Sequence, residues 1–218
     1  MRGKVPNRKQ RRKKLKPRRA ELSLLEDAVL ASGVQSLSGV DEVGRGCLAG
    51  PVVAAAVVYC PDAKLPPVAD SKVLSPQERE KLYGEIQDRC RAWAVASVSA
   101  PELDRLNIHR ASLLAMKQAV AQLSHQPDYV LVDGRFPLEL KIPQQAVIDG
   151  DNLCQVISAA SIIAKVWRDR YMVRLQEQYP RFSFGQHKGY GTQQHREELR
   201  QNGPTPEHRR SFRGVVSS

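Results

Sequence analysis

Two adjacent acidic residues, Asp41 and Glu42, stand near the end of Leu37–Val43, a short segment whose apolar residues suit a strand of a buried sheet. Burying a carboxylate is costly unless hydrogen bonds or an opposite charge compensate it. A bound cation is one such compensation, and the glycine–arginine–glycine loop at residues 44–46 offers a phosphate main-chain N–H groups. The segment therefore predicts a sheet with acids at its edge and favours metal-dependent phosphodiester chemistry.

Patterning along the rest of the chain predicts further strands and several helices. Strands are expected at Pro51–Tyr59, Trp93–Val98, Tyr129–Val132 and Gln145–Ile148. Helices are expected at residues 21–31, from the Ser75 capping box to about Cys90, after the Asn107 cap, at Cys154–Gln178 and at Thr192–Gln201. Three strands followed by alternating helices and strands indicate an α/β sheet of mixed order.

More carboxylates follow the later strands. Asp133 comes directly after one strand, and a turn containing Asp149 and Asp151 comes after the next. Ligands gather at the carboxyl ends of strands in open α/β sheets. Carboxylates that converge there repel one another unless hard divalent cations such as Mg²⁺ hold them. Two such ions, about 3.5–4 Å apart, can activate a water and stabilise the leaving oxygen of a phosphodiester.

Each acid also has a structural explanation. Asp133 precedes a glycine, which is a common turn pair, and Asp151 suits the cap of the helix that follows. Spacing alone does not decide between Asp149 and Asp151 as a ligand. Because neighbouring strand residues point to opposite faces, Asp41 and Glu42 are not expected to aim both side chains at one ion in a regular strand. One of them is expected to act through a distortion of the strand end, an intervening water or a backbone carbonyl.

The charge of the chain is concentrated at its start. Residues 1–20 hold eleven basic side chains and no acidic one, and the remaining 23 Lys and Arg balance 23 Asp and Glu. Such a segment is expected to be a disordered arm, followed by a helix and linker at residues 21–36 and one catalytic domain at residues 37–218. The arm suits non-specific, salt-dependent binding to a polyanion, or alternatively serves as a solubilising or ribosome-binding extension.

The cysteines and apolar runs indicate a cytoplasmic protein. Cys47, Cys60, Cys90 and Cys154 form neither a CxxC pair nor a zinc-like spacing, so they are interpreted as reduced thiols. No apolar core follows the basic arm as in a signal peptide, and the run Val52–Val58 is too short to span a bilayer.

Ordered motifs between residues 37 and 213 resemble bacterial ribonuclease HII. They are Gly39-Val40-Asp41-Glu42-Val43-Gly44-Arg45-Gly46, Leu48-Ala49-Gly50-Pro51-Val52-Val53, Asp70-Ser71-Lys72-Val73-Leu74-Ser75, Val132-Asp133-Gly134, Gly150-Asp151, Ser158-Ala159-Ala160-Ser161-Ile162-Ile163-Ala164-Lys165-Val166-Trp167-Arg168-Asp169, His187-Lys188-Gly189-Tyr190-Gly191-Thr192, Gly203-Pro204-Thr205-Pro206 and His208-Arg209-Arg210-Ser211-Phe212. The resemblance implies an α/β, RNase H-like mixed sheet flanked by helices, with a C-terminal helical extension.

The resemblance also implies an activity. A similar protein hydrolyses the RNA strand of RNA–DNA hybrids and incises duplex DNA on the 5′ side of embedded ribonucleotides, leaving a 3′-hydroxyl and a 5′-phosphate. Two Mn²⁺ or Mg²⁺ ions and a monomeric enzyme are implied. The alternatives are a non-catalytic nucleic-acid-binding protein and another RNase H-like nuclease that acts on DNA.

The residues that match the family motifs receive expected roles. The catalytic, metal-binding set is Asp41, Glu42, Asp133 and Asp151, which favours Asp151 over Asp149. The expected readers of the ribonucleotide are the loop Gly44, Arg45 and Gly46, through the 2′-hydroxyl, and Tyr190, through stacking on the sugar. Expected contacts to phosphates and the substrate strand are Lys72, Lys165 and Arg168, although a solvated helix face also explains Lys165 and Arg168. Asp149 departs from the family, whose members often carry lysine there.

Overall fold

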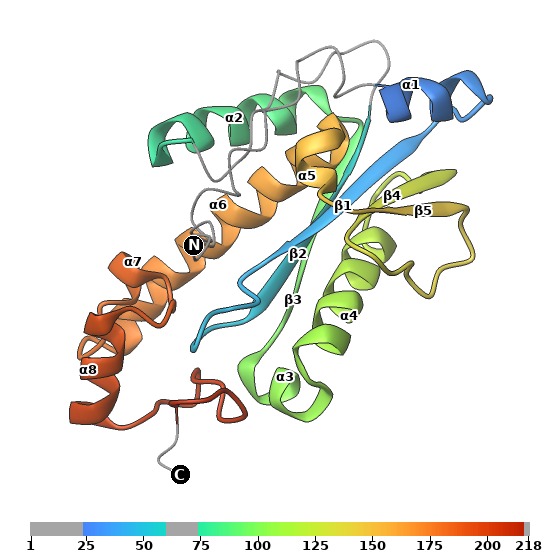
Figure 1. Cartoon of the computed structure of the whole chain (residues 1–218). Helices are drawn as coiled ribbons and strands as arrows, with labels where there is room; N and C mark the ends of the chain where they lie inside the picture. Colours follow the sequence, from blue (N-terminus) through green and yellow to red (C-terminus); the bar gives the residue numbers. More distant parts are fainter. Residues whose placement is uncertain (1–23, 60–73, 216–218) are drawn as a thin grey trace, which may run out of the picture.

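The fold is built on one five-stranded mixed sheet (Figure 1). The computed structural model describes residues 24–59 and 74–215. The strands are β1 (Leu37–Val43), β2 (Val52–Val58), β3 (Ala92–Val98), β4 (Tyr129–Asp133) and β5 (Gln144–Val147), in the order β3-β2-β1-β4-β5. β1 pairs antiparallel with β2 and parallel with β4, and β3 and β5 form the edges. The expected strands and the mixed order are confirmed.

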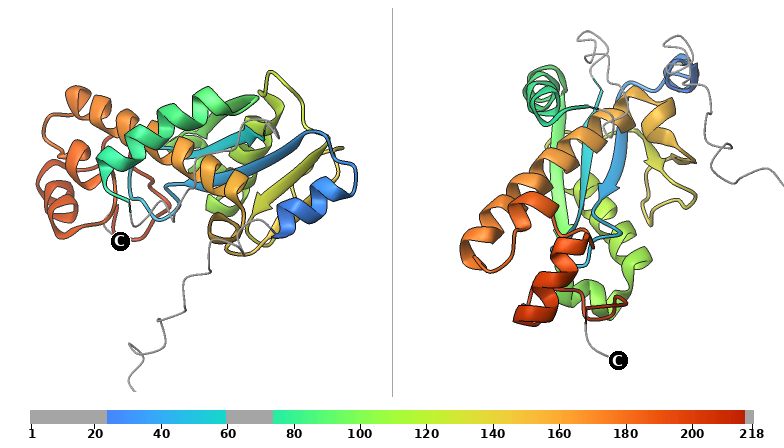
Figure 2. Two further views of the ribbon diagram at one scale, coloured as in Figure 1. Left: turned by 90° about the horizontal axis from the view of Figure 1, so that it is seen from above. Right: turned by 60° about the vertical axis from the view of Figure 1, so that its left-hand side comes forward.

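Helices cover both faces of this sheet (Figures 1 and 2). One face packs against α6 (Gln155–Gln178), with α1 (Leu24–Ala31) and α2 (Pro76–Arg89) beside it. The other face packs against α4 (Ile108–Ala121), which follows the short α3 (Ala100–Leu106). Because both faces are covered, β2 is a continuous apolar run with every residue buried, as a central strand requires.

The last part of the chain packs around the far end of α6. It contains α7 (Phe184–His187) and α8 (Gln193–Asn202), and a third apolar cluster joins them to the second half of α6. None of the helices in the two described ranges is long and apolar enough to cross a membrane.

Three short helices were not expected from the sequence. The helix α3 begins after Ser99, whose hydroxyl accepts a hydrogen bond from the Glu102 N–H. A serine at this capping position is the sequence feature that indicates the start of α3. The one-turn helices α7 and α5 (Gly150–Leu153) are too short for periodicity to reveal. The expectation that Asp151 caps the long helix is wrong, because Asp151 lies in α5 and α6 begins separately at Gln155.

Candidate metal-dependent active site

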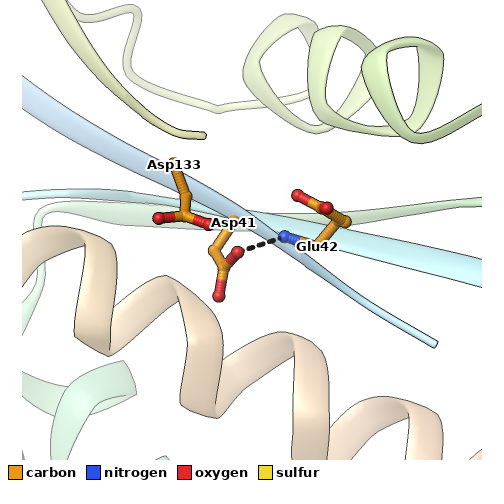
Figure 3. A group of neighbouring side chains, drawn as sticks. All are labelled: Asp41, Glu42 and Asp133. Atoms are coloured by element: carbon orange, nitrogen blue, oxygen red, sulfur yellow. Dashed lines mark hydrogen bonds between the residues drawn. The ribbon is translucent and has the colours of Figure 1, made fainter. Parts of the chain in front are cut away.

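Three carboxylates meet at the carboxyl ends of the two central parallel strands. Asp41 and Glu42 come from β1 and Asp133 is the last residue of β4, and one oxygen of each lies within 4.8 Å of the others (Figure 3). Asp41 and Glu42 are neighbours on β1, and in a regular strand their side chains were not expected to aim at one ion. The two side chains leave the strand in different directions, but one oxygen of each still reaches the shared space.

Asp151 approaches this cluster from α5. Its side chain is buried, and it accepts a hydrogen bond from the Asn152 side-chain amide at 3.0 Å. The same helix is tied to the cluster because Gly150 N–H donates to Asp133 Oδ1 at 2.8 Å. Asp149, in contrast, is exposed and adopts a left-handed conformation with φ of 56°. The structure therefore brings Asp151 toward the three carboxylates as a buried group.

Burial and mutual repulsion raise the pKa values of the clustered acids. The pKa of Asp41 lies well above its ordinary value, first because of burial and then because of the charges of Asp133 and Glu42. Burial also raises the pKa of Glu42, although Arg45 offsets part of this effect, and burial followed by the charge of Asp151 raises the pKa of Asp133. Carboxylates held together at such a cost suit a hard divalent cation, whose charge compensates theirs.

The loop after β1 lies beside the acids. Gly44 has φ of +91°, and a Cβ atom there would lie 2.3 Å from Nε of Arg168, so the position requires glycine. Arg45 donates from Nη1 to Glu42 Oε1 at 3.1 Å and is 46% exposed. Its side chain lines a cavity of about 720 Å³ together with all four acids.

Tyr190 and Lys165 line the same cavity. The Tyr190 residue is 40% exposed, and its strand-like bridge to Cys47 holds it against the loop that follows β1. Nζ of Lys165 lies 5.9 Å from the centre of the Tyr190 ring and 2.7 Å from an oxygen of Asp169. The cavity thus combines five acids, the expected four and Asp149, with a partly exposed aromatic ring and four basic side chains, Arg45, Arg79, Arg135 and Lys165.

Arg168 has a different place from the one expected. It is fully buried, and its guanidinium donates to the carbonyl oxygens of Pro51 at 3.1 Å, Ala49 at 3.1 Å and Lys188 at 2.9 Å. A solvated helix face is therefore wrong for Arg168, and direct contact with a substrate is not open to this buried side chain. Instead, Arg168 joins the loop after β1 to the segment that carries Tyr190. Lys72 and the basic arm lie outside the described residues.

Two buried histidines that were not assigned a role fix the main chain of Tyr190. The Thr205 N–H donates to His208 Nδ1 at 3.0 Å, so the proton of His208 sits on Nε2 and is donated to His195 Nε2 at 3.0 Å. His195 then donates its Nδ1 proton to the Tyr190 carbonyl oxygen at 2.9 Å. Burial lowers the pKa of both imidazoles to about 4, which keeps them neutral and the chain of hydrogen bonds intact near pH 7.

Comparisons with known proteins match most of the chain to one family. The family model described as Ribonuclease HII matches residues 38–215. The ribonuclease HII of Bordetella pertussis is 53% identical over 176 residues, which cover 81% of this chain and 88% of that protein. The ribonuclease HII of Coxiella burnetii is 51% identical over 179 residues, covering 82% and 89%.

A solved structure shows the same fold. The RNase HII of Archaeoglobus fulgidus, determined as a complex with PCNA, superposes with a TM-score of 0.70 at 29% identity and covers 81% of this chain and 95% of that one. The expected RNase H-like sheet flanked by helices is therefore confirmed.

Proposed function

The chain belongs to the ribonuclease HII family, the metal-dependent type 2 ribonucleases H that act on RNA–DNA hybrids, and from this premise we propose its finer activity. It hydrolyses the RNA strand of hybrids and also incises duplex DNA on the 5′ side of single embedded ribonucleotides. The products carry a 3′-hydroxyl and a 5′-phosphate, and the enzyme acts as a monomer.

One observation carries this proposal. A single cavity is lined by the four carboxylates of the expected metal-binding set and also by Tyr190 and Arg45. Hydrolysis of a phosphodiester needs the acids, whereas a partly exposed aromatic ring beside them supplies a flat surface for a sugar or base. A nuclease that distinguishes ribose from deoxyribose needs both in one place, because the ribose to be recognised belongs to the nucleotide whose 5′-phosphate is attacked.

The four acids are the residues that hold the metal. Asp41, Glu42 and Asp133 offer oxygens to a shared point, and Asp151 approaches it from α5. When bound, two Mg²⁺ or Mn²⁺ ions polarise the phosphodiester and make water a better nucleophile. The raised pKa values of Asp41, Glu42 and Asp133 fit this role, since a cation offsets both the cost of burying these charges, which is the main cause of the shifts, and the repulsion between them.

The remaining residues orient the substrate. The loop of Gly44, Arg45 and Gly46 recognises the 2′-hydroxyl, and Tyr190 packs against the sugar next to it. Lys165, half-buried between the Tyr190 ring and Asp169, contacts a backbone phosphate. Arg168 does not contact the substrate. It joins the two recognition segments, which are the loop after β1 and the segment that carries Tyr190, through hydrogen bonds to Pro51 O and Lys188 O.

The test uses the purified full chain with Mg²⁺ or Mn²⁺ on a DNA duplex that contains one ribonucleotide, beside an all-DNA duplex. We expect one metal-dependent nick 5′ of the ribonucleotide and an intact control. Cutting of both duplexes would instead assign the chain to a nuclease that acts on DNA. Salt-sensitive binding without any nick would support a non-catalytic nucleic-acid-binding protein.

Tyr190→Ala is expected to reduce cleavage of the single-ribonucleotide duplex by about 10-fold, because a stacking contact of this kind is worth about 1–3 kcal/mol. Tyr190→Phe keeps the ring and serves as the matched control, with most of the rate retained. The measurement is the initial rate on the ribonucleotide duplex under saturating Mn²⁺, with the thermal midpoint of each variant. Equal rates for wild type and Tyr190→Ala would remove Tyr190 from substrate recognition.

A further inference from the structure

The first turn of α6 lacks a cap of its own. The N-cap position is Cys154, whose side chain makes no capping hydrogen bond. The turn is nevertheless deep in the protein, since Val156 and Ile157 are fully buried. Buried N–H groups at a helix start need acceptors, because water does not reach them.

A carboxylate from α1 supplies these acceptors. Oε1 of Glu26 accepts a hydrogen bond from the Val156 N–H at 2.7 Å. Burial raises the pKa of Glu26 to about 7, and the N–H groups of Val156 and Gln155 offset part of this shift. Glu26 is only 7% exposed, although it lies 130 residues earlier in the chain. Its helix α1 precedes residues 38–215, which the family model matches. A carboxylate at a helix start also interacts favourably with the helix dipole.

The capped turn lies between the two parts of the acidic cluster. On one side it packs closely against β1 at Gly39, two residues before Asp41. A Cβ atom at Gly39 would lie only 2.4 Å from the Val156 carbonyl carbon, so there is no room for a side chain. On the other side it continues into α5, where Cys154 N–H donates to Gly150 O at 2.8 Å. A Cβ atom at Gly150 would lie 2.7 Å from the Ile157 side chain, so α5 also packs tightly on this turn.

We propose that Glu26 is a positioning residue for the metal site, which caps α6 from α1 and thereby fixes the separation between Asp151 and the acids of β1. This inference rests on the proposed function in one respect, namely that these acids bind divalent cations. Without the carboxylate, the first turn of α6 loses its acceptors and frays. α5 then loses its support, and Asp151 moves relative to Asp41 and Glu42.

The test is a calorimetric titration of the full chain with Mn²⁺, without substrate. We expect Glu26→Ala to weaken Mn²⁺ binding by about 10-fold, in the range found when a residue that supports a metal ligand is lost. Asp27→Ala removes a carboxyl group from the neighbouring, exposed position of α1 and is expected to change the affinity by less than about twofold. Hydrogen exchange at Gln155 and Val156 is expected to accelerate in Glu26→Ala and not in Asp27→Ala.

A second control separates positioning from general loss of stability. Val120→Ala truncates a buried side chain of α4 on the opposite face of the sheet, and we expect it to lower stability while leaving Mn²⁺ affinity unchanged. If Glu26→Ala does not fold, Glu26→Asp, which is shorter by one methylene, gives the decisive titration.

The outcomes distinguish the two proposals. Wild-type affinity in a folded Glu26 variant, or equal weakening in Val120→Ala, overturns the role of Glu26 and leaves the proposed function in place. A wild-type chain that binds no Mn²⁺ contradicts the proposed function itself, and the role of Glu26 at the metal site with it.

Discussion

Asp41→Asn is expected to lower the cleavage rate on an RNA–DNA hybrid by more than about 100-fold while the fold persists. Asp41 is the most buried of the clustered acids, and one of its oxygens lies within 4.8 Å of an oxygen of Glu42 and of Asp133. Even residues that only support metal ligands contribute about 10–100-fold to affinity or activity, so the loss of a ligand should exceed that range. The measurement is a single-turnover rate at saturating Mn²⁺, with circular dichroism to establish folding.

The same substitution is expected to stabilise the metal-free protein near neutral pH. Because burial and its acidic neighbours raise the folded-state pKa of Asp41, the folded chain holds this proton more tightly than the unfolded chain does. The stabilising contribution of the protonated form is complete below the unfolded pKa, about 4, and is lost as the pH rises through the folded value. Thermal unfolding in a chelator should therefore show a smaller loss of stability with rising pH in Asp41→Asn than in wild type.

Asp149→Asn is the matched control for both measurements. Asp149 lines the same cavity, but it is exposed and lies outside the group of close carboxylates. Asparagine also tolerates the left-handed conformation found there. We expect near-wild-type cleavage for Asp149→Asn. Full turnover by Asp41→Asn would contradict the assignment of Asp41 to the active site.

Arg168→Met is expected to lower the free energy of unfolding by about 3 kcal/mol or more. The substitution keeps an unbranched apolar stem but leaves the carbonyl oxygens of Pro51, Ala49 and Lys188 without their charged donor. Each buried polar group that loses its partner costs about 1–3 kcal/mol. Urea unfolding followed by fluorescence gives the free energy, and cleavage of the ribonucleotide duplex should fall because both recognition segments lose their shared support.

Arg170→Met tests whether this effect is specific. Arg170 lies on the same helix and pairs with Glu80, but about half of each side chain is exposed. Exposed ion pairs contribute about 0–1 kcal/mol, so the control should lose little stability. Equal losses in the two variants would show that the buried contacts of Arg168 are not the source of the effect.

Local patterns predicted most of the fold. Val52–Val58 and Ala92–Val98 are strands because their apolar residues follow the burial that the sheet imposes, continuous in the first and alternating in the second. The capping box at Ser75 marked the start of α2, as the reciprocal hydrogen bonds between Ser75 and Glu78 confirm. Such signals lie within a few residues of one another, which is why the sequence displays them.

The site was predictable only in part. The strand pattern of an α/β sheet predicted that the strand-end acids Asp41, Glu42 and Asp133 gather at one edge. The choice of Asp151 over Asp149 needed the family resemblance, since both residues stand in one turn. The burial of Arg168 and the contact of Glu26 with α6 had no local signal. Glu26 and Val156 are 130 residues apart, and nothing near either one indicates that they meet.

The parallel pairing of β1 with β4 has a consequence for how the enzyme matures. Asp41 and Asp133 become neighbours only after a chain of about ninety residues has wound through β2, β3 and α4 and returned to the sheet. A nascent or misassembled chain in which β4 has not docked presents scattered carboxylates with little affinity for a divalent ion. Binding of the metal therefore stabilises only the fully paired sheet, because a ligand that binds one state shifts the equilibrium toward that state.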